Sequence, residues 1–520
     1  MAHKNHVINK TIQVGSSTLL SRILGIIREL LMVRYLGAGA VSDAFLTAFK
    51  IPNSLRKIFA EGALSSALVP SLVSLSKQNH GQHGINQLLS LAFLIFEGAV
   101  LLLCAVAMIF AKQVITLVAP GFSAEQIAYA TPFLRILMPF IFFVSSSALL
   151  AGALQAVKHF FVPAISSVIL NIFFIAGILL GLFFGTSVEV LCYFILLGGA
   201  VQFAAHVTAY RKLGFSFELF DKGTWKECKH VLRKFFPCLF SMSVAEVGLF
   251  LDTSFASFLA KGSVTLLYYG NRFMGIPSGV FAAALSTVLL PYLSHLGLYA
   301  PKRLSFYLLE IAKLVFWVTA PTTLIMGFFA DKIFYTMFYS KNFSLEQVSE
   351  ARLILIAFLA GLFFISLNKI LMNIYYALHN TTKPAIIAVI ATVTNIVLNF
   401  ILMYWLQAVG LALATTLSTI LQTILFVWFL RKYFNFKIYL QPFMIFVRNF
   451  SIQMFVILAP LFVVYQGITN LIHYLGSPSA IHYALGTVLF WLWVGPLIGI
   501  AAWLLYTTRK FFKISIYFLN

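Results

Sequence analysis

The chain has 520 residues, of which 61% are hydrophobic and 10% are charged, and its formal net charge is +21. Soluble domains carry about 25% charged residues, so this composition excludes a soluble globular protein and predicts a polytopic membrane protein. In a soluble chain, the excess of 36 Lys and Arg over 15 Asp and Glu would favour nucleic acid. Here the positions of the basic residues, described below, predict no nucleic-acid partner.

The N-terminal residues MAHKNHVINK resemble the start of a signal peptide. Arg22 and Arg28 interrupt the apolar run that follows, and no small-residue cleavage site comes at the right distance. We therefore expect the segment to be retained. The four cysteines show no paired or metal-type spacing, and we interpret them as packing residues.

Hydropathy over a window of about 19 residues predicts fourteen membrane-crossing helices. Each is long enough to cross a hydrocarbon core of about 30 Å. The segments lie near 11–36, 41–76, 86–111, 128–155, 162–185, 187–210, 232–260, 264–294, 304–330, 348–378, 384–406, 408–430, 444–470 and 482–507. The expected fold class is an all-α integral membrane protein.

Basic residues collect at one set of helix ends. When the fourteen segments alternate in direction, twenty Lys and Arg lie on one side and four on the other. The positive-inside rule then predicts that both termini are cytoplasmic. Twelve basic residues remain within the segments, and these require a functional explanation.

Two sequence matches at one offset predict an internal duplication. The stretch AVKHFFVPAISSVI from Ala156 matches ALHNTTKPAIIAVI from Ala377, and Pro70 matches Pro291, both 221 residues apart. Six helices per copy keep both copies in the same orientation in the membrane. The resulting organisation is a first lobe at 1–212, a cytoplasmic linker at 213–231, a second lobe at 232–432, and two further helices with a cytoplasmic tail at 433–520.

The first two segments carry an unusual density of charge. Polar side chains of the second segment fall within about 40° of one line on an ideal helix: Asp43, Lys50, Ser54, Lys57 and Glu61. One interpretation is mutual neutralisation, since Lys57 and Glu61 are four residues apart. However, residues 22–61 contain six basic groups and three acids, so this stretch cannot neutralise itself.

Four arginines extend this pattern to both lobes. Arg22 lies in the first segment on the face that carries Glu29, and Arg28 lies beside that face. Arg56 lies off the polar line of the second segment, which Pro52 can kink. Arg272 lies in the eighth segment, the repeat partner of the second, where its alternative role is an isolated interhelical hydrogen bond. If the four guanidinium groups converge, they suit the oxygens of a diphosphate.

Three stretches carry a family resemblance: SRILGIIRE, GAGAVSDAFLTAFKIPNSLRKIFAEGALSSALVP and GSVTLLYYGNRFMGIPSGV. They resemble signature segments of the MurJ/MviN family of lipid II flippases, and the fourteen-segment layout is similar over essentially the whole chain. The resemblance implies a transporter and not an enzyme. Such a transporter has the six-plus-six fold of the multidrug/oligosaccharidyl-lipid/polysaccharide exporter superfamily. It moves undecaprenyl-diphosphate-linked peptidoglycan precursor across the bacterial inner membrane by alternating access.

The resemblance also assigns site residues. The substrate-binding positions that it implies are Arg22, Arg28, Arg56, Arg272, Ser21, Glu29, Asp43, Lys50 and Glu61. Three positions depart from the family pattern: Glu29 stands where Asp is common, and Asn271 and Gly275 stand where acids are common. The second lobe is therefore more cationic than is usual in the family, which agrees with an anionic substrate.

Asp252, Asn395 and Asn399 form a weaker pattern, in which the two asparagines lie one turn apart. Oxygen ligands of this kind can hold a small hard cation, and the resemblance to sodium-coupled family members suggests a sodium site. The alternative is ordinary hydrogen bonding between helices. Membrane potential supplies about 2.3 kcal/mol per charge per 100 mV, so a bound cation is not obligatory, and no other cofactor is expected.

The last two segments, 444–470 and 482–507, are nearly free of charge. They are interpreted as lining an apolar groove for a polyprenyl tail, or alternatively as facing lipid. The expected partners are lipid II, the bilayer and enzymes of wall synthesis, and the chain is expected to be a monomer.

Three alternative functions stay open from the residues alone. One is a flippase for another polyprenyl-diphosphate glycan, one is a cation-coupled drug exporter of the same superfamily, and one is a non-transporting membrane scaffold. An integral-membrane phosphotransferase is disfavoured, because the four Asp of the chain form no metal-binding cluster.

Overall fold

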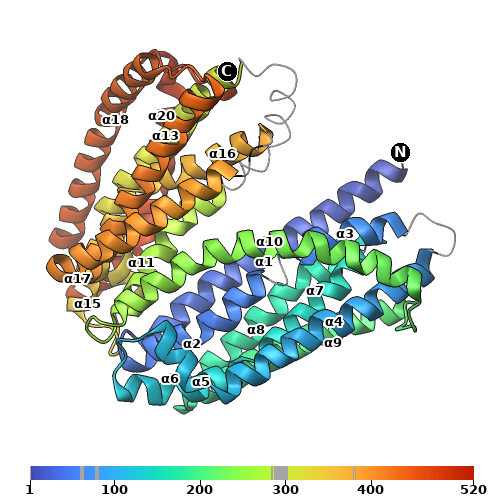
Figure 1. Cartoon of the computed structure of the whole chain (residues 1–520). Helices are drawn as coiled ribbons and strands as arrows, with labels where there is room; N and C mark the ends of the chain where they lie inside the picture. Colours follow the sequence, from blue (N-terminus) through green and yellow to red (C-terminus); the bar gives the residue numbers. More distant parts are fainter. Residues whose placement is uncertain are drawn as a thin grey trace. The chain divides into compact units, whose positions relative to one another are not determined.

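The computed structural model describes residues 2–58, 64–75, 81–157, 159–282, 285, 303–378, 380 and 382–519. These residues form helices, with no strand in the described ranges beyond one isolated bridge between Ser340 and Phe343. The helices of Figure 1 are α1 (Ala2–Leu36), α2 (Ala40–Arg56), α3 (Leu64–Leu75), α4 (Gly81–Ile109), α5 (Ala111–Val118), α6 (Ala124–Leu137), α7 (Phe140–Ala156), α8 (Phe161–Phe184), α9 (Val188–Lys212), α10 (Lys222–Ala256), α11 (Ser263–Pro277), η2 (Ser278–Ala282), α13 (Leu304–Phe328), α14 (Ala330–Phe338), α15 (Leu345–Leu359), α16 (Leu362–Ala377), α17 (Thr382–Phe434), α18 (Leu440–Leu475), α19 (Pro478–Gly486), α20 (Phe490–Thr507), η4 (Thr508–Lys510) and η5 (Tyr517–Leu519).

Many of these helices are long and apolar enough to cross a membrane. Within the described residues eight helical stretches meet that condition, and the pair α15 and α16, bent by 42°, makes up to nine. The 53 residues of α17 would reach about 80 Å at a rise of about 1.5 Å per residue, more than one crossing needs. Gln407, at φ 50° and ψ −132°, breaks α17 into two helices, as the segments 384–406 and 408–430 predict. The all-α integral membrane fold is thus confirmed.

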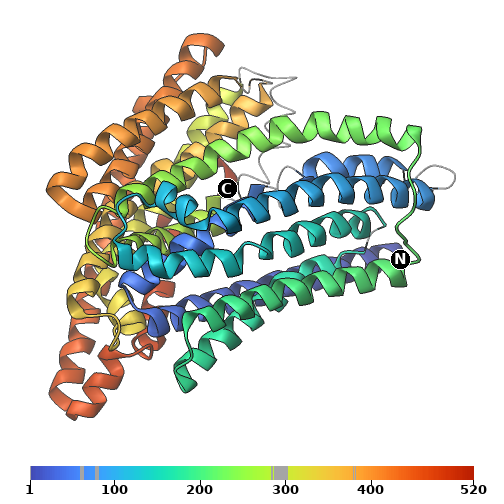
Figure 2. The same cartoon turned by 60° about the horizontal axis from the view of Figure 1, so that its bottom comes forward.

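The chain divides into two compact units, Met1–Thr265 and Leu266–Asn520. In the first unit α8 packs between α1 and α9, and α8 and α9 lie side by side in both views (Figures 1 and 2). Small residues allow this close approach: a Cβ added at Gly177 would lie 2.8 Å from Phe194 Cβ, and one at Gly198 would lie 2.9 Å from Phe173 Cβ. Helices in lipid associate through such small-residue contacts because apolar burial alone does not drive them together.

Helix α10 also belongs to the first unit, where it packs against α3 and α4. Residues 222–231, which the sequence assigns to a linker, are its first turns. Asp221 caps the helix, its carboxylate accepting a hydrogen bond from Thr224 N at 2.7 Å. Cys228, Val231 and Phe235 then recur at helical spacing and are buried in the core with residues of α4. The second copy of the duplication begins with α10, yet α10 packs on the first unit. The boundary between the two copies therefore differs from the boundary between the two compact units.

The C-terminal tail packs against the helices of the second unit. Ile514 and Ile516 are buried among apolar residues of α13, α18 and α20. Glu310 of α13 accepts a hydrogen bond from Tyr517 N at 2.7 Å and forms an ion pair with Lys313 at 2.6 Å. The tail after α20 is therefore part of the folded unit.

Candidate functional site

The polar line predicted on α2 faces α10 within the first unit. Lys50 Nζ donates a hydrogen bond to Thr253 Oγ1. Ser54 Oγ donates to Glu246 Oε2 at 2.6 Å, and Lys57 Nζ donates to the two carboxylate oxygens of Glu246 at 3.2 and 3.4 Å. Four of the five predicted positions are in the described residues: Lys50, Ser54 and Lys57 contact α10, and Asp43 contacts the segment at the start of α11. Glu61 lies outside the described residues.

Asp43, the first residue of this line, is 1% exposed. Its carboxylate accepts hydrogen bonds from Gly262 N at 2.7 Å, from Thr265 N at 2.9 Å and from Thr265 Oγ1 at 2.6 Å. Because α11 begins at Ser263, the carboxylate satisfies backbone donors at the start of this helix. In this structure Asp43 anchors the segment between α10 and α11, a role that its position in a polar line does not predict.

Arg28 belongs to a second network, between α1 and α8. Its guanidinium donates to Glu29 Oε1 at 2.7 Å and to Asn171 Oδ1 at 3.1 Å, and lies 4.8 Å from the centre of the Phe174 ring. Asn171 Nδ2 in turn donates to the carbonyl and hydroxyl oxygens of Ser21 at 3.2 and 3.3 Å. Three predicted residues, Ser21, Arg28 and Glu29, are therefore connected through one asparagine of α8, and the guanidinium is held in a fixed orientation.

The other three arginines are more open. Arg22 on α1 and Arg272 on α11 are exposed. Arg56 is half-buried at the end of α2, and its Nε donates to Asn53 Oδ1 at 3.2 Å. Arg272 belongs to the second unit, and its convergence with the arginines of the first unit stays a prediction.

The residues of the suggested sodium site lie in different units: Asp252 on α10 in the first, and Asn395 and Asn399 on α17 in the second. Asn399 Nδ2 donates to Asn395 Oδ1 at 3.1 Å, and Asn395 Nδ2 donates to Thr415 Oγ1 across the α17 break at 3.4 Å. Asn399 Oδ1 is buried and makes no hydrogen bond to any described atom. An oxygen in this position fits a cation ligand, whereas the described residues contain no group of three His, Cys, Asp or Glu that could hold a metal ion.

Several partners of the predicted residues were not identified from the sequence. Glu246 and Thr253 on α10 and Asn171 on α8 complete the two networks. An acid inside an apolar segment is costly and therefore usually functional or paired, so Glu246 carried a signal that the sequence analysis left unused. Thr253 and Asn171 carried no comparable signal, because single hydroxyl and amide groups are common in membrane helices.

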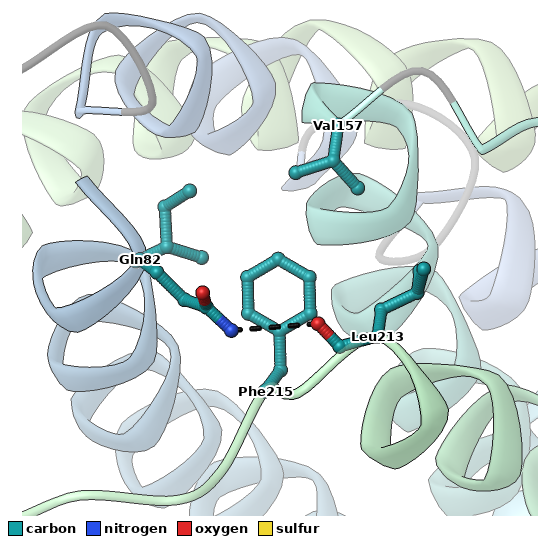
Figure 3. A pocket seen from close by; sticks show the side chains of 5 residues that line it. Gln82, Val157, Leu213 and Phe215 are labelled. Carbon is teal, nitrogen blue, oxygen red and sulfur yellow. Dashed lines mark hydrogen bonds between the residues drawn. The ribbon is translucent and has the colours of Figure 1, made fainter.

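A separate pocket of about 260 Å³ lies where α4 begins and α9 ends. Figure 3 shows the Phe215 ring between Gln82 and Leu213, and Gln82 Nε2 donates to Leu213 O at 3.4 Å. Phe215 also stacks on Tyr210 with ring centres 5.0 Å apart. The linker is therefore docked on the first unit by an aromatic side chain, apart from the charged networks.

Outside the spanning segments, Glu218 of this linker accepts hydrogen bonds from Asn86 Nδ2 at 2.5 Å and from Ser216 Oγ at 3.1 Å. The hydrogen bond from Asn86 has the largest effect on the pKa of the Glu218 carboxyl. Together with the Ser216 bond and His83, it holds this pKa below its ordinary value of 4.5. The linker thus has a polar as well as an aromatic attachment.

Comparison with known proteins agrees with this description. The sequence profile of the family described as lipid II flippase MurJ matches residues 32–484. A probable lipid II flippase MurJ of Haemophilus influenzae is 33% identical over 417 residues, covering 76% of this chain and 80% of the relative. The lipid II flippase MurJ of Burkholderia cenocepacia is 32% identical over 407 residues, covering 76% and 78%.

Among solved structures, a lipid II flippase MurJ in an inward closed conformation superposes with a TM-score of 0.77 at 27% identity, covering 97% of this chain and 99% of that one. The inward-facing conformation of a multidrug resistance MATE family transporter of the MOP superfamily has a TM-score of 0.61 at 16% identity, covering 77% of this chain and 92% of that one, and has a similar fold. The profile match over most of the chain and the curated relatives together show that this chain belongs to the lipid II flippase MurJ family.

Proposed function

We infer that the protein is a flippase that moves lipid II from the inner to the outer leaflet of the cytoplasmic membrane. The observation that carries this inference is the family membership together with two polar networks built on α1 and α2. Ionisable groups in spanning helices are expensive and normally serve a substrate path. The cell-wall role and the multi-pass membrane location follow from the same family.

The diphosphate of the substrate is proposed to bind Arg22, Arg28, Arg56 and Arg272. The exposure of Arg22 and Arg272 and the fixed guanidinium of Arg28 support this assignment. Arginine presents a planar set of donors that matches two phosphate oxygens at once. Glu29 then acts on the substrate through Arg28, which it orients by the 2.7 Å hydrogen bond.

The polyprenyl tail is proposed to lie against α18 and α20. Their outward side chains are apolar and strongly exposed: Phe455 at 74%, Val463 at 68%, Leu492 at 72% and Trp503 at 63%. Contact with ordinary lipid chains would present the same surface, so photocrosslinking of a polyprenyl probe to residues of α18 separates the two assignments.

Alternating access is proposed to use bends in α2 and α11. Pro52 lies inside α2, and the helix changes to π-type turns at residues 57 and 58; Pro277 ends α11, and the π-helix η2 follows at once. Proline removes a helical hydrogen bond, and π-turns often mark functional sites. Both prolines are thus followed by irregular helix, which supports bending there.

The driving force is proposed to be the membrane potential, with both termini cytoplasmic. A sodium ion held by Asn395 and Asn399 is the alternative to the membrane potential. The buried Asn399 Oδ1, which makes no hydrogen bond to a described atom, supports it, whereas Asp252 lies in the other unit and its part in the site stays a prediction. A sodium ion would supply positive charge between the two helices of α17 when bound. Sodium should then raise the thermal stability of the purified wild-type protein over the same concentration of choline. Equal stability in both salts for Asn399→Ala and for the wild type would contradict the site.

The function is tested in cells depleted of their own lipid II flippase. The wild-type chain should restore growth and the appearance of lipid II at the outer leaflet, whereas Arg28→Ala and Arg272→Ala should not. Arg211→Ala, at the end of α9 and outside both networks, serves as the matched control. Full growth with Arg272→Ala at normal expression would contradict the arginine assignment. A wild-type chain that gives no lipid II at the outer leaflet would contradict the function itself.

A further inference from the structure

Glu246 is an acid of α10 whose two carboxylate oxygens are both used by α2. Oε2 accepts the Ser54 hydroxyl at 2.6 Å, and the Lys57 ammonium contacts Oε1 at 3.2 Å and Oε2 at 3.4 Å. Its side chain is 14% exposed. The carboxylate therefore neutralises a cation of the candidate site from a different helix.

A hydroxyl and an ammonium that converge on two oxygens of one anion are also the donors that bind phosphate. We propose that Glu246 is an internal anion that occupies the donors of Ser54 and Lys57 until a phosphate group of the substrate displaces it. This proposal rests on the proposed function, because it assigns a regulation to the same site.

The exposure of the two donors is unequal, as displacement requires. Ser54 is 1% exposed, whereas the Lys57 side chain is 38% exposed. A ligand can therefore reach the ammonium while the carboxylate is still in place. An ion pair with one partner this open contributes little to stability, so a multiply charged anion can replace the carboxylate without unfolding the helix pair.

The exchange also gives selectivity. A bound carboxylate carries one negative charge, so a phosphodiester headgroup of ordinary phospholipid, which also carries one, gains nothing in charge by replacing it. A diphosphate carries more negative charge and does gain. Competition by an internal group is a form of selection against the wrong ligand, and here it would exclude the phospholipids that surround the protein.

The test uses the full-length protein in detergent and two soluble probes, inorganic pyrophosphate and glycerophosphoglycerol, whose affinities are measured by calorimetry. Glu246→Gln is nearly isosteric and removes the charge. It should bind pyrophosphate about five- to tenfold more tightly than the wild type, and it should gain binding of glycerophosphoglycerol. Glu246→Asp, which keeps the charge, should resemble the wild type, and Lys57→Met should weaken binding of pyrophosphate.

The outcomes separate this inference from the proposed function. Unchanged affinity and selectivity in Glu246→Gln, with weaker binding in Lys57→Met, would overturn the internal anion and leave the anion site intact. Failure of every variant to bind pyrophosphate would overturn the diphosphate site and this inference with it. Binding by Glu246→Gln alone would support the inference in its strongest form. If the amide variant does not fold, Glu246→Ala also vacates the donors and carries the same expectation.

Discussion

Replacing Asp43 by Ala should destabilise the first unit even when no substrate is present. The Asp43 carboxylate is buried and accepts two backbone N–H groups, those of Gly262 and Thr265, at the start of α11. The Thr265 hydroxyl also contacts Ser42 Oγ at 3.0 Å, so it retains a partner after the replacement. The two backbone donors have no such alternative within the described contacts, and they would be left buried.

The size of the effect follows from these two donors. Leaving a buried donor unsatisfied costs about 1–3 kcal/mol, so Asp43→Ala, which leaves two, should lower the free energy of unfolding by about 2–6 kcal/mol. In Asp43→Asn the amide oxygen can still accept from Thr265 N, whereas the Gly262 N–H and the Gln126 amide, which donate to Asp43 Oδ2 at 2.7 and 3.5 Å, lose their acceptor. That variant should cost about 1–3 kcal/mol.

Denaturant unfolding of the purified protein, followed by tryptophan fluorescence, should give the order wild type, Asp43→Asn, Asp43→Ala from most to least stable. Thr265→Ala serves as the partner variant, since a double-mutant cycle with Asp43→Ala should show coupling of about 0.5–3 kcal/mol. Asp43→Ala as stable as the wild type would refute the capping role. That result would indicate that Asp43 acts mainly in substrate binding.

Three further predictions concern other parts of the fold. Gln407→Gly should stabilise the protein by about 1 kcal/mol in the same unfolding assay, because its φ of 50° favours glycine; a loss of stability would contradict the strained turn. Gly177→Ala should destabilise by about 1–3 kcal/mol, since the new Cβ would lie 2.8 Å from Phe194 Cβ, whereas Gly98→Ala, with no atom within 4 Å, should be neutral. The depressed pKa of Glu218 means that the contribution of this carboxylate to linker docking is fully present above pH 4.5 and is lost as the pH falls below that value. The protection of residues 213–221 from hydrogen exchange, corrected for the intrinsic pH dependence of amide exchange, should therefore fall in acid, and an unchanged acid response in Glu218→Gln would show that another group is responsible.

The helices themselves were largely predictable from the sequence. The predicted boundary between the segments 384–406 and 408–430 coincides with the break at Gln407, because an apolar stretch of this length exceeds a single crossing of the membrane. The turns of α10 before residue 232 were not predicted, because their buried apolar residues, Cys228 and Val231, are few and lie among charged ones. A window of about 19 residues averages these apolar residues with the charged residues around them.

For the candidate site, periodicity predicted a face but not what that face contacts. Asp43, Lys50, Ser54 and Lys57 share a face of α2 as expected, yet their partners lie on α10 and at the start of α11. The spacing of residues along one helix contains no information about which helix will face it. For this reason the sequence offered Glu61 as a partner of Lys57 but not Glu246, which forms an ion pair with Lys57 in the structure.

The structure also distinguishes the cations that are already bound to other groups from those that are open. Lys50, Lys57 and Arg28 are each engaged within the first unit by groups that reduce their attraction for an outside anion. Arg22 is exposed and is therefore open to an outside anion. An incoming diphosphate gains most from a cation that it does not have to separate from another anion. First contact should therefore occur at Arg22, and Lys57 should join only after Glu246 has moved, so replacement of Arg22 should slow association while replacement of Lys57 should speed release.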